Sequence, residues 1–319
     1  MSEPFVLDAS FSTLRAESFT NDAVGRLVQN AVTGTGADTV SLDRTLVNSV
    51  DETTSQRLDS WKVTDQKHSG RCWEFAGLNV LRAKVIDELK VDDFQFSQNY
   101  IAFFDKLEKA NHTLSRATAT ASRDASEEEV RSIMDYPSED GGWWFQFTDI
   151  VAKYGLVPSR AMPDTESAGN TAQMNQALAT VLRRAIGRIR EAATNSDPAE
   201  GSAHMEAVRN EALNAVWRIL AIHLGTPPTS FMWQYRDKDK NFHRKGTYTP
   251  LKYAHEIVPQ AFDPWVALAH DPREEHPVGR TYVHEHTPYM EGGTPYWHLS
   301  VGLDPVSYTH LRAHETKAN

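Results

Sequence analysis

The chain has 319 residues, of which 40% are hydrophobic and 24% are charged, a balance typical of a globular protein of about two domains. Its formal net charge of −10 argues against nucleic acid or an anionic membrane surface as a main partner, because both require a basic surface. The single cysteine excludes an intramolecular disulfide and any zinc site that needs two thiolates.

The first 60 residues predict a polar N-terminal arm. Ser, Thr and Asp clusters alternate with short apolar runs in residues 1–60, and we expect an extended segment and loops with one short helix near residues 21–33. The sequence shows neither a signal peptide nor a run of about 18 apolar residues. We therefore expect a cytoplasmic protein without a membrane span.

Residues 61–160 predict a helical domain. Apolar side chains recur about every 3.6 residues over residues 72–90, which predicts a helix. Ser69 and Gly70 directly precede this segment and can turn the chain and cap the start of the helix.

Two further helices are predicted in the same domain. One spans residues 97–110 with Ser97 as its N-cap, and the other spans residues 143–153 with Gly155 directly after its end. Residues 111–130 lie between them and are rich in Ala, Thr, Ser and Glu. We expect a polar helix or a surface excursion there.

The second half of the chain changes from a helical to a β-rich pattern. Residues 161–228 predict a helical hairpin insertion, because apolar stripes with helical spacing run along residues 171–192 and 203–223. We interpret these stripes as core-facing surfaces rather than cofactor sites. Residues 229–305 are rich in aromatic residues, Gly and Pro, and they predict the start of a β-rich domain that is incomplete in this chain.

The strongest chemical signal surrounds the single cysteine. Cys72 is the first residue of a predicted helix, where free backbone N–H groups and the helix dipole favour the thiolate, which is the nucleophilic form. Gln66 lies six residues upstream, and its amide can donate to an oxygen beside the cysteine, as an oxyanion hole requires. Trp73 would shield the sulfur from water. A lone cysteine is otherwise more often a small buried apolar residue, but this context favours a nucleophile.

The pattern of Gln66, Ser69-Gly70 and Cys72-Trp73 resembles the papain-like cysteine peptidases, and specifically their bleomycin hydrolase/aminopeptidase C branch. The resemblance covers about residues 60–303 and includes the segments 96–100, 105–111, 140–142, 153–158, 235–243 and 279–283. It implies an α+β papain-like fold with a helical N-terminal half, a helical insertion and only the start of the β-rich C-terminal half.

The resemblance also implies roles for individual residues. Cys72 would be the nucleophile, and Gln66 with the Cys72 backbone N–H would form the oxyanion hole. Gly141 and Gly142 would bind substrate together with Trp73, and glycine suits this role because an extended peptide must approach the backbone closely. The other interpretation of Gly141 and Gly142 is an ordinary turn before the next helix. No cofactor and no metal are implied.

The general base is not assigned within this chain. The resemblance places the catalytic His and the orienting Asn in the C-terminal β-rich half, beyond where this chain ends, so we expect neither in this sequence. We interpret His68 as a surface or cleft-rim residue, and His284 and His286 as solvated strand residues rather than metal ligands. Residues 306–319 do not continue the family pattern, and we expect a truncated chain with a non-native tail.

The implied activity is that of a cytosolic thiol aminopeptidase, which cleaves N-terminal residues from peptides with a free N-terminus through an acyl-enzyme. The family also implies a homo-oligomer, a hexamer. Two alternatives remain: a non-catalytic helical binding or assembly protein, and an inactive fragment. For the polypeptide as written we expect no hydrolysis of aminoacyl amides, because it lacks the general base.

Overall fold

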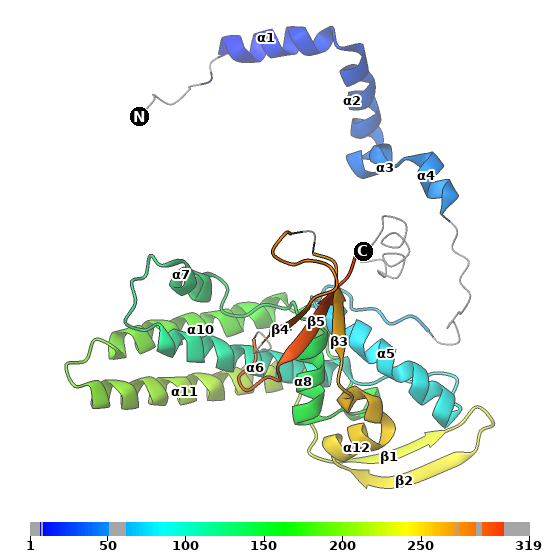
Figure 1. Cartoon of the computed structure of the whole chain (residues 1–319), viewed down its shortest axis with the longest axis vertical. Coiled ribbons are helices and arrows are strands. Elements are labelled where there is room, and N and C mark those ends of the chain that lie inside the picture. Colours follow the sequence, from blue (N-terminus) through cyan, green and yellow to red (C-terminus); the bar gives the residue numbers. More distant parts are fainter. Residues whose placement is uncertain (1–6, 8, 51–61, 272, 285–288, 303–319) are drawn as a thin grey trace. The chain divides into compact units, whose positions relative to one another are not determined.

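The computed structural model describes residues 7, 9–50, 62–271, 273–284 and 289–302 (Figure 1). The chain forms two compact units, Met1–Arg57 and Leu58–Asn319. The finer division at residues 160 and 228 stays a prediction. None of the described helices has the length and apolarity needed to cross a bilayer.

The first unit is helical, which corrects the expectation of an extended arm with loops. The helix expected near residues 21–33 is confirmed. The described helices of this unit are α1 (Ala9–Thr20), α2 (Ala23–Thr35), α3 (Ala37–Ser41) and α4 (Arg44–Ser49). The polar residues that suggested loops instead support helices. Asp22 caps α2 by accepting from the Gly25 N–H at 2.9 Å, and the Thr13 hydroxyl donates to the Ala9 carbonyl at 3.1 Å.

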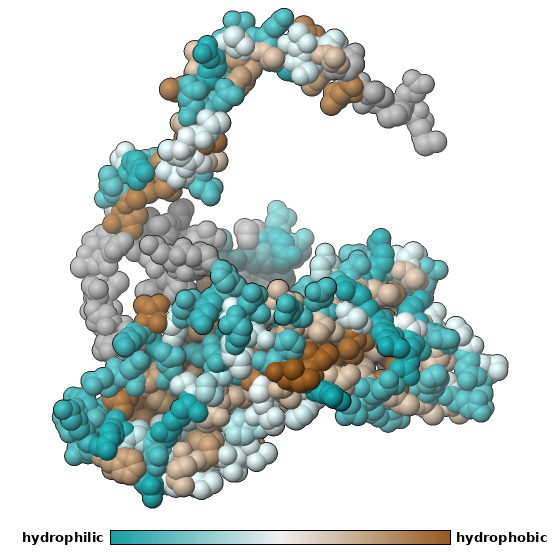
Figure 2. All heavy atoms as spheres, turned by 180° about the vertical axis from the view of Figure 1, so that it is seen from behind, coloured by the Kyte–Doolittle hydropathy of each residue, from teal (hydrophilic) through white to brown (hydrophobic). Residues whose placement is uncertain are grey.

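This first unit has no core of its own among its described residues, none of which is buried. Apolar side chains such as Leu14, Leu27 and Leu46 are exposed, and Figure 2 shows hydrophobic and hydrophilic side chains mixed on the surface of these helices. Helices of this length take most of their stability from packing of an apolar face. Within the described residues of this unit, that contribution is small.

The second unit begins with α5, which confirms the helix predicted over residues 72–90. The helices of its first part are α5 (Cys72–Leu89), α6 (Gln98–Ala119), α7 (Glu128–Asp135) and α8 (Trp144–Tyr154). The predicted capping of α5 by Ser69 and Gly70 is wrong, since Arg71 occupies the N-cap position and makes no side-chain cap bond. Ser69 lies too far upstream to cap, and its hydroxyl donates to the Gln66 carbonyl at 2.6 Å.

Helix α6 begins as predicted and continues further than predicted. Its N-cap is Ser97, whose hydroxyl accepts from the Tyr100 N–H at 3.0 Å. The helix continues to Ala119 because buried side chains such as Leu114 extend its packed face. The polar stretch at residues 111–130 is therefore the end of α6, a turn and the start of α7.

Gly155 ends α8, as the sequence indicates. It has φ of 77°, and its N–H donates to the Val151 carbonyl at 2.8 Å. A Cβ atom at this position would lie 2.3 Å from the backbone of Pro250. Glycine is therefore required both by the backbone conformation and by the close approach of the chain at the start of α12.

The predicted helical hairpin is present as α10 (Ala172–Ala192) and α11 (Pro198–Leu224), which pack against each other and against α6 (Figure 1). Helix α11 starts several residues earlier than expected because Pro198 stands in its first turn and Asp197 caps it. The Asp197 carboxylate accepts from the Ala199 N–H at 2.9 Å. The short helices η1 (Ser159–Ala161) and α9 (Glu166–Gly169) precede the hairpin.

The strands follow the hairpin, in agreement with the predicted change to a β-rich pattern. Strands β1 (Phe231–Arg236) and β2 (Phe242–Tyr248) pair antiparallel. The second sheet has the order β3–β5–β4, with β5 parallel to β3 and antiparallel to β4. Its strands are β3 (Val266–Ala269), β4 (Thr281–His284) and β5 (Tyr296–Ser300), and α12 (Pro250–Ile257) and η2 (Pro259–Phe262) lie between the sheets in sequence.

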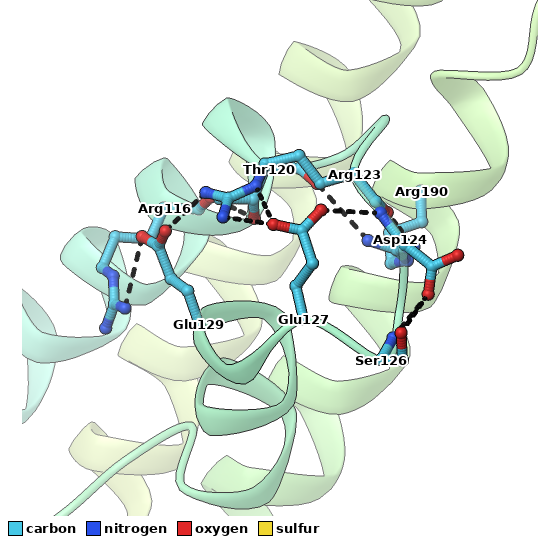
Figure 3. A network of polar contacts seen from close by, with 8 residues as sticks. All are labelled: Arg116, Thr120, Arg123, Asp124, Ser126, Glu127, Glu129 and Arg190. Atoms are coloured by element: carbon cyan, nitrogen blue, oxygen red, sulfur yellow. Dashed lines mark hydrogen bonds and ion pairs between the residues drawn. The ribbon is translucent and has the colours of Figure 1, made fainter.

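A surface network supports the turn between α6 and α7 (Figure 3). Arg123 binds Glu127 at 2.5 and 2.9 Å and Glu129 at 2.5 Å. From α10, the Arg190 guanidinium donates to the Arg123 carbonyl at 2.7 Å. The ion pairs of this network are exposed, so each adds little to stability. The network positions a turn and holds no group that the site below requires.

The hairpin gives a direct test of the core. Leu220 of α11 is fully buried, whereas Ile222 two residues later is 72% exposed. Leu220→Ala should lower the free energy of unfolding by about 2–5 kcal/mol, because it leaves a cavity, and Ile222→Ala should change it by less than about 0.5 kcal/mol. Urea unfolding followed by circular dichroism measures both. Equal effects of the two substitutions would contradict the packing described.

Candidate active site

The loop before α5 is closed by two reciprocal hydrogen bonds. The Gln66 side-chain amide donates to the Ser69 carbonyl at 2.8 Å, and the Ser69 hydroxyl donates to the Gln66 carbonyl at 2.6 Å. The His68 N–H donates to the Gly169 carbonyl at 3.0 Å, which fastens the loop to the end of α9. The position of Gln66 ahead of the cysteine is therefore fixed by the loop itself.

Arg71 anchors the residue directly before the cysteine. Its guanidinium binds both carboxylate oxygens of Asp164 at 3.1 Å, and its Nε donates to the Ser69 hydroxyl at 3.0 Å. The arginine is 3% exposed, and its guanidinium lies 5.1 Å from the centre of the Phe75 ring. A bidentate arginine–carboxylate pair restricts orientation as well as distance. The pair therefore restricts the direction in which the backbone leads into α5.

Cys72 is the first residue of α5 and its side chain is exposed. The N–H groups of a helix's first turn have no partner within the helix, so the backbone around the sulfur offers donors. A side-chain amide carries two N–H groups, and within the described part of the chain Gln66 uses its amide nitrogen only for the Ser69 carbonyl. Cys72 is therefore an exposed side chain at a helix start whose backbone N–H groups lack partners within the helix, which suits a nucleophile whose target oxygen becomes negative.

Trp73 lies against Gly142, the second residue of the glycine pair Gly141–Gly142. The Trp73 indole is 9% exposed, and its Nε1 donates to the Asp140 carbonyl at 2.9 Å. A Cβ atom on Gly142 would lie 2.5 Å from the indole ring, whereas a Cβ atom on Gly141 would meet nothing within 4 Å. Gly142 is thus packed against the first turn of α5, and Gly141 is open. In the structure, Trp73 is buried and packs against this segment.

A buried group of charges lies behind the glycine pair. The Lys109 ammonium donates to the Gly141 carbonyl at 2.6 Å and to Asp105 at 2.8 Å. Lys106 donates to the Asp140 carboxylate and, at 2.8 Å, to the Glu139 carbonyl. Both lysines are 3% exposed. Buried charges are stable only when they are paired and hydrogen-bonded, as these are.

The pKa values of two carboxyl groups in this cluster are shifted in opposite directions. Burial by itself would raise the pKa of Asp140, but the Lys106 ammonium and hydrogen bonds from Asn175 and Thr171 lower that pKa to about 2. Burial, followed by the nearby Asp105 carboxylate, raises the pKa of Glu74 well above its usual value. Asp140 is therefore ionised at neutral pH, whereas the environment of Glu74 favours its neutral form.

No described histidine forms a hydrogen bond with Cys72. His68 is exposed in the loop before α5. His284 lies on β4, where its Nε2 is 2.7 Å from Nδ1 of His298. Burial, and then the two histidines His298 and His276, lower the pKa of His284. His286 lies outside the described residues, so the prediction for it is untested. Within the described ranges, no group of three or more His, Cys, Asp and Glu side chains is placed to hold a metal ion.

Sequence reasoning missed the lysine cluster. The only signal was the spacing of Asp105 and Lys109, four residues apart on one face of α6. Such a pair usually lies on a solvated face. The partners that bury it, residues 139–141, are about thirty residues away in sequence.

The contrast between the two glycines is testable. Gly142→Ala should lower the free energy of unfolding by about 1–3 kcal/mol, because the methyl group would overlap the Trp73 indole. Gly141→Ala should have little effect, since its Cβ would meet no neighbour. Chemical denaturation of the two variants measures the difference. A larger loss for Gly141→Ala would show that the segment is packed differently.

Residues 7–316 match the family model described as the Peptidase C1-like family. The chain is 35% identical over 250 residues to aminopeptidase C from Listeria monocytogenes, which covers 78% of this chain and 55% of that protein. It is 36% identical over 235 residues to bleomycin hydrolase from Homo sapiens, covering 72% of this chain and 51% of that protein. The chain spans about half the length of these two curated relatives.

Among solved structures, the fold is similar to that of PepW from Lactobacillus rhamnosis, with a TM-score of 0.83 and 31% identity over 97% of this chain and 68% of that one. The resemblance to bleomycin hydrolase and aminopeptidase C and the α+β papain-like fold are thereby confirmed. Because the family model matches nearly the whole chain, the chain belongs to the Peptidase C1-like family.

Proposed function

We propose that this chain carries the nucleophile-bearing half of a cysteine-type aminopeptidase, which removes N-terminal residues from peptides with a free N-terminus. The observation that carries the proposal is the exposed Cys72 at the start of α5, preceded by a loop in which the Gln66 amide is held by the Ser69 carbonyl. The two relatives described above, an aminopeptidase C and a bleomycin hydrolase, also support the proposal. A cytoplasmic location and assembly as a hexamer remain predictions of this proposal.

The proposed reaction proceeds through an acyl-enzyme. The Cys72 thiolate attacks the carbonyl carbon of the substrate's first residue, and the Cys72 N–H and the Gln66 amide donate to the oxygen as it becomes negative. The C–N bond then breaks, and the leaving amine takes a proton from a general acid. Water adds to the thioester, which releases the N-terminal residue and restores the thiol.

The general acid and base are proposed to lie in the part of the relatives' length that this chain does not span. An imidazole is the usual partner of a catalytic thiolate. The described histidines form no hydrogen bond with Cys72, so none of them is proposed for this role. We propose that Gly141 and Gly142 carry the substrate backbone, because Gly141 is open to close approach while Gly142 is supported by Trp73.

Covalent labelling tests the proposal on the chain itself. Cys72 is the only cysteine, so mass spectrometry reports its modification without ambiguity. Relative to chloroacetamide, a dipeptidyl chloromethyl ketone with a free N-terminus should label Cys72 faster by a larger factor than it labels free cysteine, because the peptide and its carbonyl oxygen are recognised. Gln66→Ala should reduce the ratio of the two rates by roughly tenfold or more, since an oxyanion donor is lost.

Two controls complete the labelling experiment. Cys72→Ser should take up neither reagent. Thr64→Ala removes a polar side chain from the same loop, one that pairs with Asn79 rather than with the sulfur, and should leave the rate ratio unchanged. A wild-type chain whose rate ratio for the two reagents equals that of free cysteine would contradict the peptidase proposal.

A further inference from the structure

Lys109, a buried lysine of α6, holds the backbone that contains the glycine pair. Its ammonium donates to the Gly141 carbonyl at 2.6 Å, to Asp105 at 2.8 Å and to the Glu139 carbonyl at 3.1 Å. An ammonium group has three N–H donors, and each of the three has an acceptor here. Two of these acceptors are carbonyls of the segment 139–142, so the lysine is satisfied only while that segment keeps its conformation.

Lys106 holds the same segment one helical turn earlier. It donates to the Glu139 carbonyl at 2.8 Å and to the Asp140 carboxylate. The same carboxylate accepts from the Thr171 hydroxyl at 3.0 Å and from the Asn175 amide at 2.9 Å, both at the start of the hairpin helix α10. Asp140 therefore connects the segment to two helices that do not carry the cysteine.

The opposite side of the segment contacts the nucleophile helix. Trp73 donates to the Asp140 carbonyl, and its indole fills the space where a side chain at Gly142 would lie. The Lys109 ammonium is 5.4 Å from the centre of the Trp73 ring, within the range of a cation–π contact. The segment is thus held between the lysines of α6 and the residue that follows Cys72.

We infer that Lys106 and Lys109 are positioning residues that fix the Gly141–Gly142 segment relative to Cys72, so that a peptide lying along the segment presents its carbonyl to the sulfur. The inference rests on the proposed function, since it takes the segment to be the peptide-binding edge. Both lysines bind the segment from behind through their ammonium groups, and the exposed side at Gly141 stays free for a peptide. Neither lysine touches the reacting atoms.

The test uses Lys109→Met, with Lys84→Met as the matched control. Lys84 is a half-exposed lysine of α5 that pairs with Glu88, four residues along the helix. Two readouts are measured on each variant. One is the rate ratio between the dipeptidyl chloromethyl ketone and chloroacetamide at Cys72, and the other is cleavage after Glu139 by a glutamate-specific protease, followed by mass spectrometry of the new terminus.

Lys109→Met should lower the labelling ratio by about tenfold or more, because charge-assisted hydrogen bonds to the segment are lost. Its reaction with chloroacetamide should stay close to that of the wild type. Cleavage after Glu139 should become at least about tenfold faster, since cleavage requires local opening of the segment. Lys84→Met should change neither quantity.

A second variant covers the case in which the single substitution does not fold. Lys109→Met leaves Asp105 buried without its cation, which is strongly destabilising. The double variant Asp105→Asn/Lys109→Met removes both charges and keeps an oxygen for the Gln146 amide, which donates to Asp105 at 2.6 Å in the wild type. The double variant should show the same two changes.

The outcomes separate the inference from the proposed function. Unchanged cleavage after Glu139 in both folded variants would overturn the positioning role, whatever the labelling shows. Faster cleavage with an unchanged labelling ratio would also overturn it, because the held segment would then have no part in peptide recognition. If the wild type itself shows no preference for the peptidyl reagent beyond that of free cysteine, the proposed function fails, and the cleavage data still report whether Lys109 holds the segment.

Discussion

Two ammonium groups buried beside the first turn of α5 constrain the rest of the site. Removing an ion from water costs several kcal/mol even after relaxation, and Lys106 and Lys109 are both almost fully buried. Their charges are matched by Asp105 and Asp140, while the environment of Glu74 favours its neutral form. Their remaining donors reach the carbonyls of Glu139 and Gly141. The buried lysines therefore stabilise the conformation of the glycine segment, and the carbonyls of that segment stabilise the buried lysines.

The backbone is also held on the other side of the cysteine. Arg71 is bound to Asp164 through two parallel hydrogen bonds, and Gln66 and Ser69 close the preceding loop on themselves. The Cys72 side chain, in contrast, is exposed. Fixed backbone on both sides of an open nucleophile is the arrangement that preorganised catalysis requires, because reacting atoms must meet in one geometry. The hydrogen bonds that hold this backbone are made by residues around Cys72 and not by Cys72 itself.

Helical periodicity predicted α5, α8, α10 and α11 and the start of α6, since each has an apolar face with regular spacing. In residues 9–50 only the helix near residues 21–33 was predicted, because the helices there have no buried face and their Ser and Thr hydroxyls resemble loop residues. Of the candidate site, Gln66 and Trp73 could be proposed because they are local in sequence to Cys72, whereas Gly141 and Gly142 came from the family resemblance. The lysine cluster was not predictable, because the Asp105–Lys109 spacing also fits a solvated helix face, and only the folded contact with residues 139–141 distinguishes the two.

The ion pair between the buried Lys106 and Asp140 should hold the glycine segment in place. A double-mutant cycle with Lys106→Met and Asp140→Asn, read from the free energy of unfolding in urea, measures that interaction without reference to activity. The account predicts a coupling free energy of about 1–3 kcal/mol, typical of contacting charged partners. Lys84→Met combined with Asp140→Asn should be additive within about 0.5 kcal/mol. Additive effects for Lys106→Met and Asp140→Asn would contradict the claim that this ion pair holds the glycine segment in place.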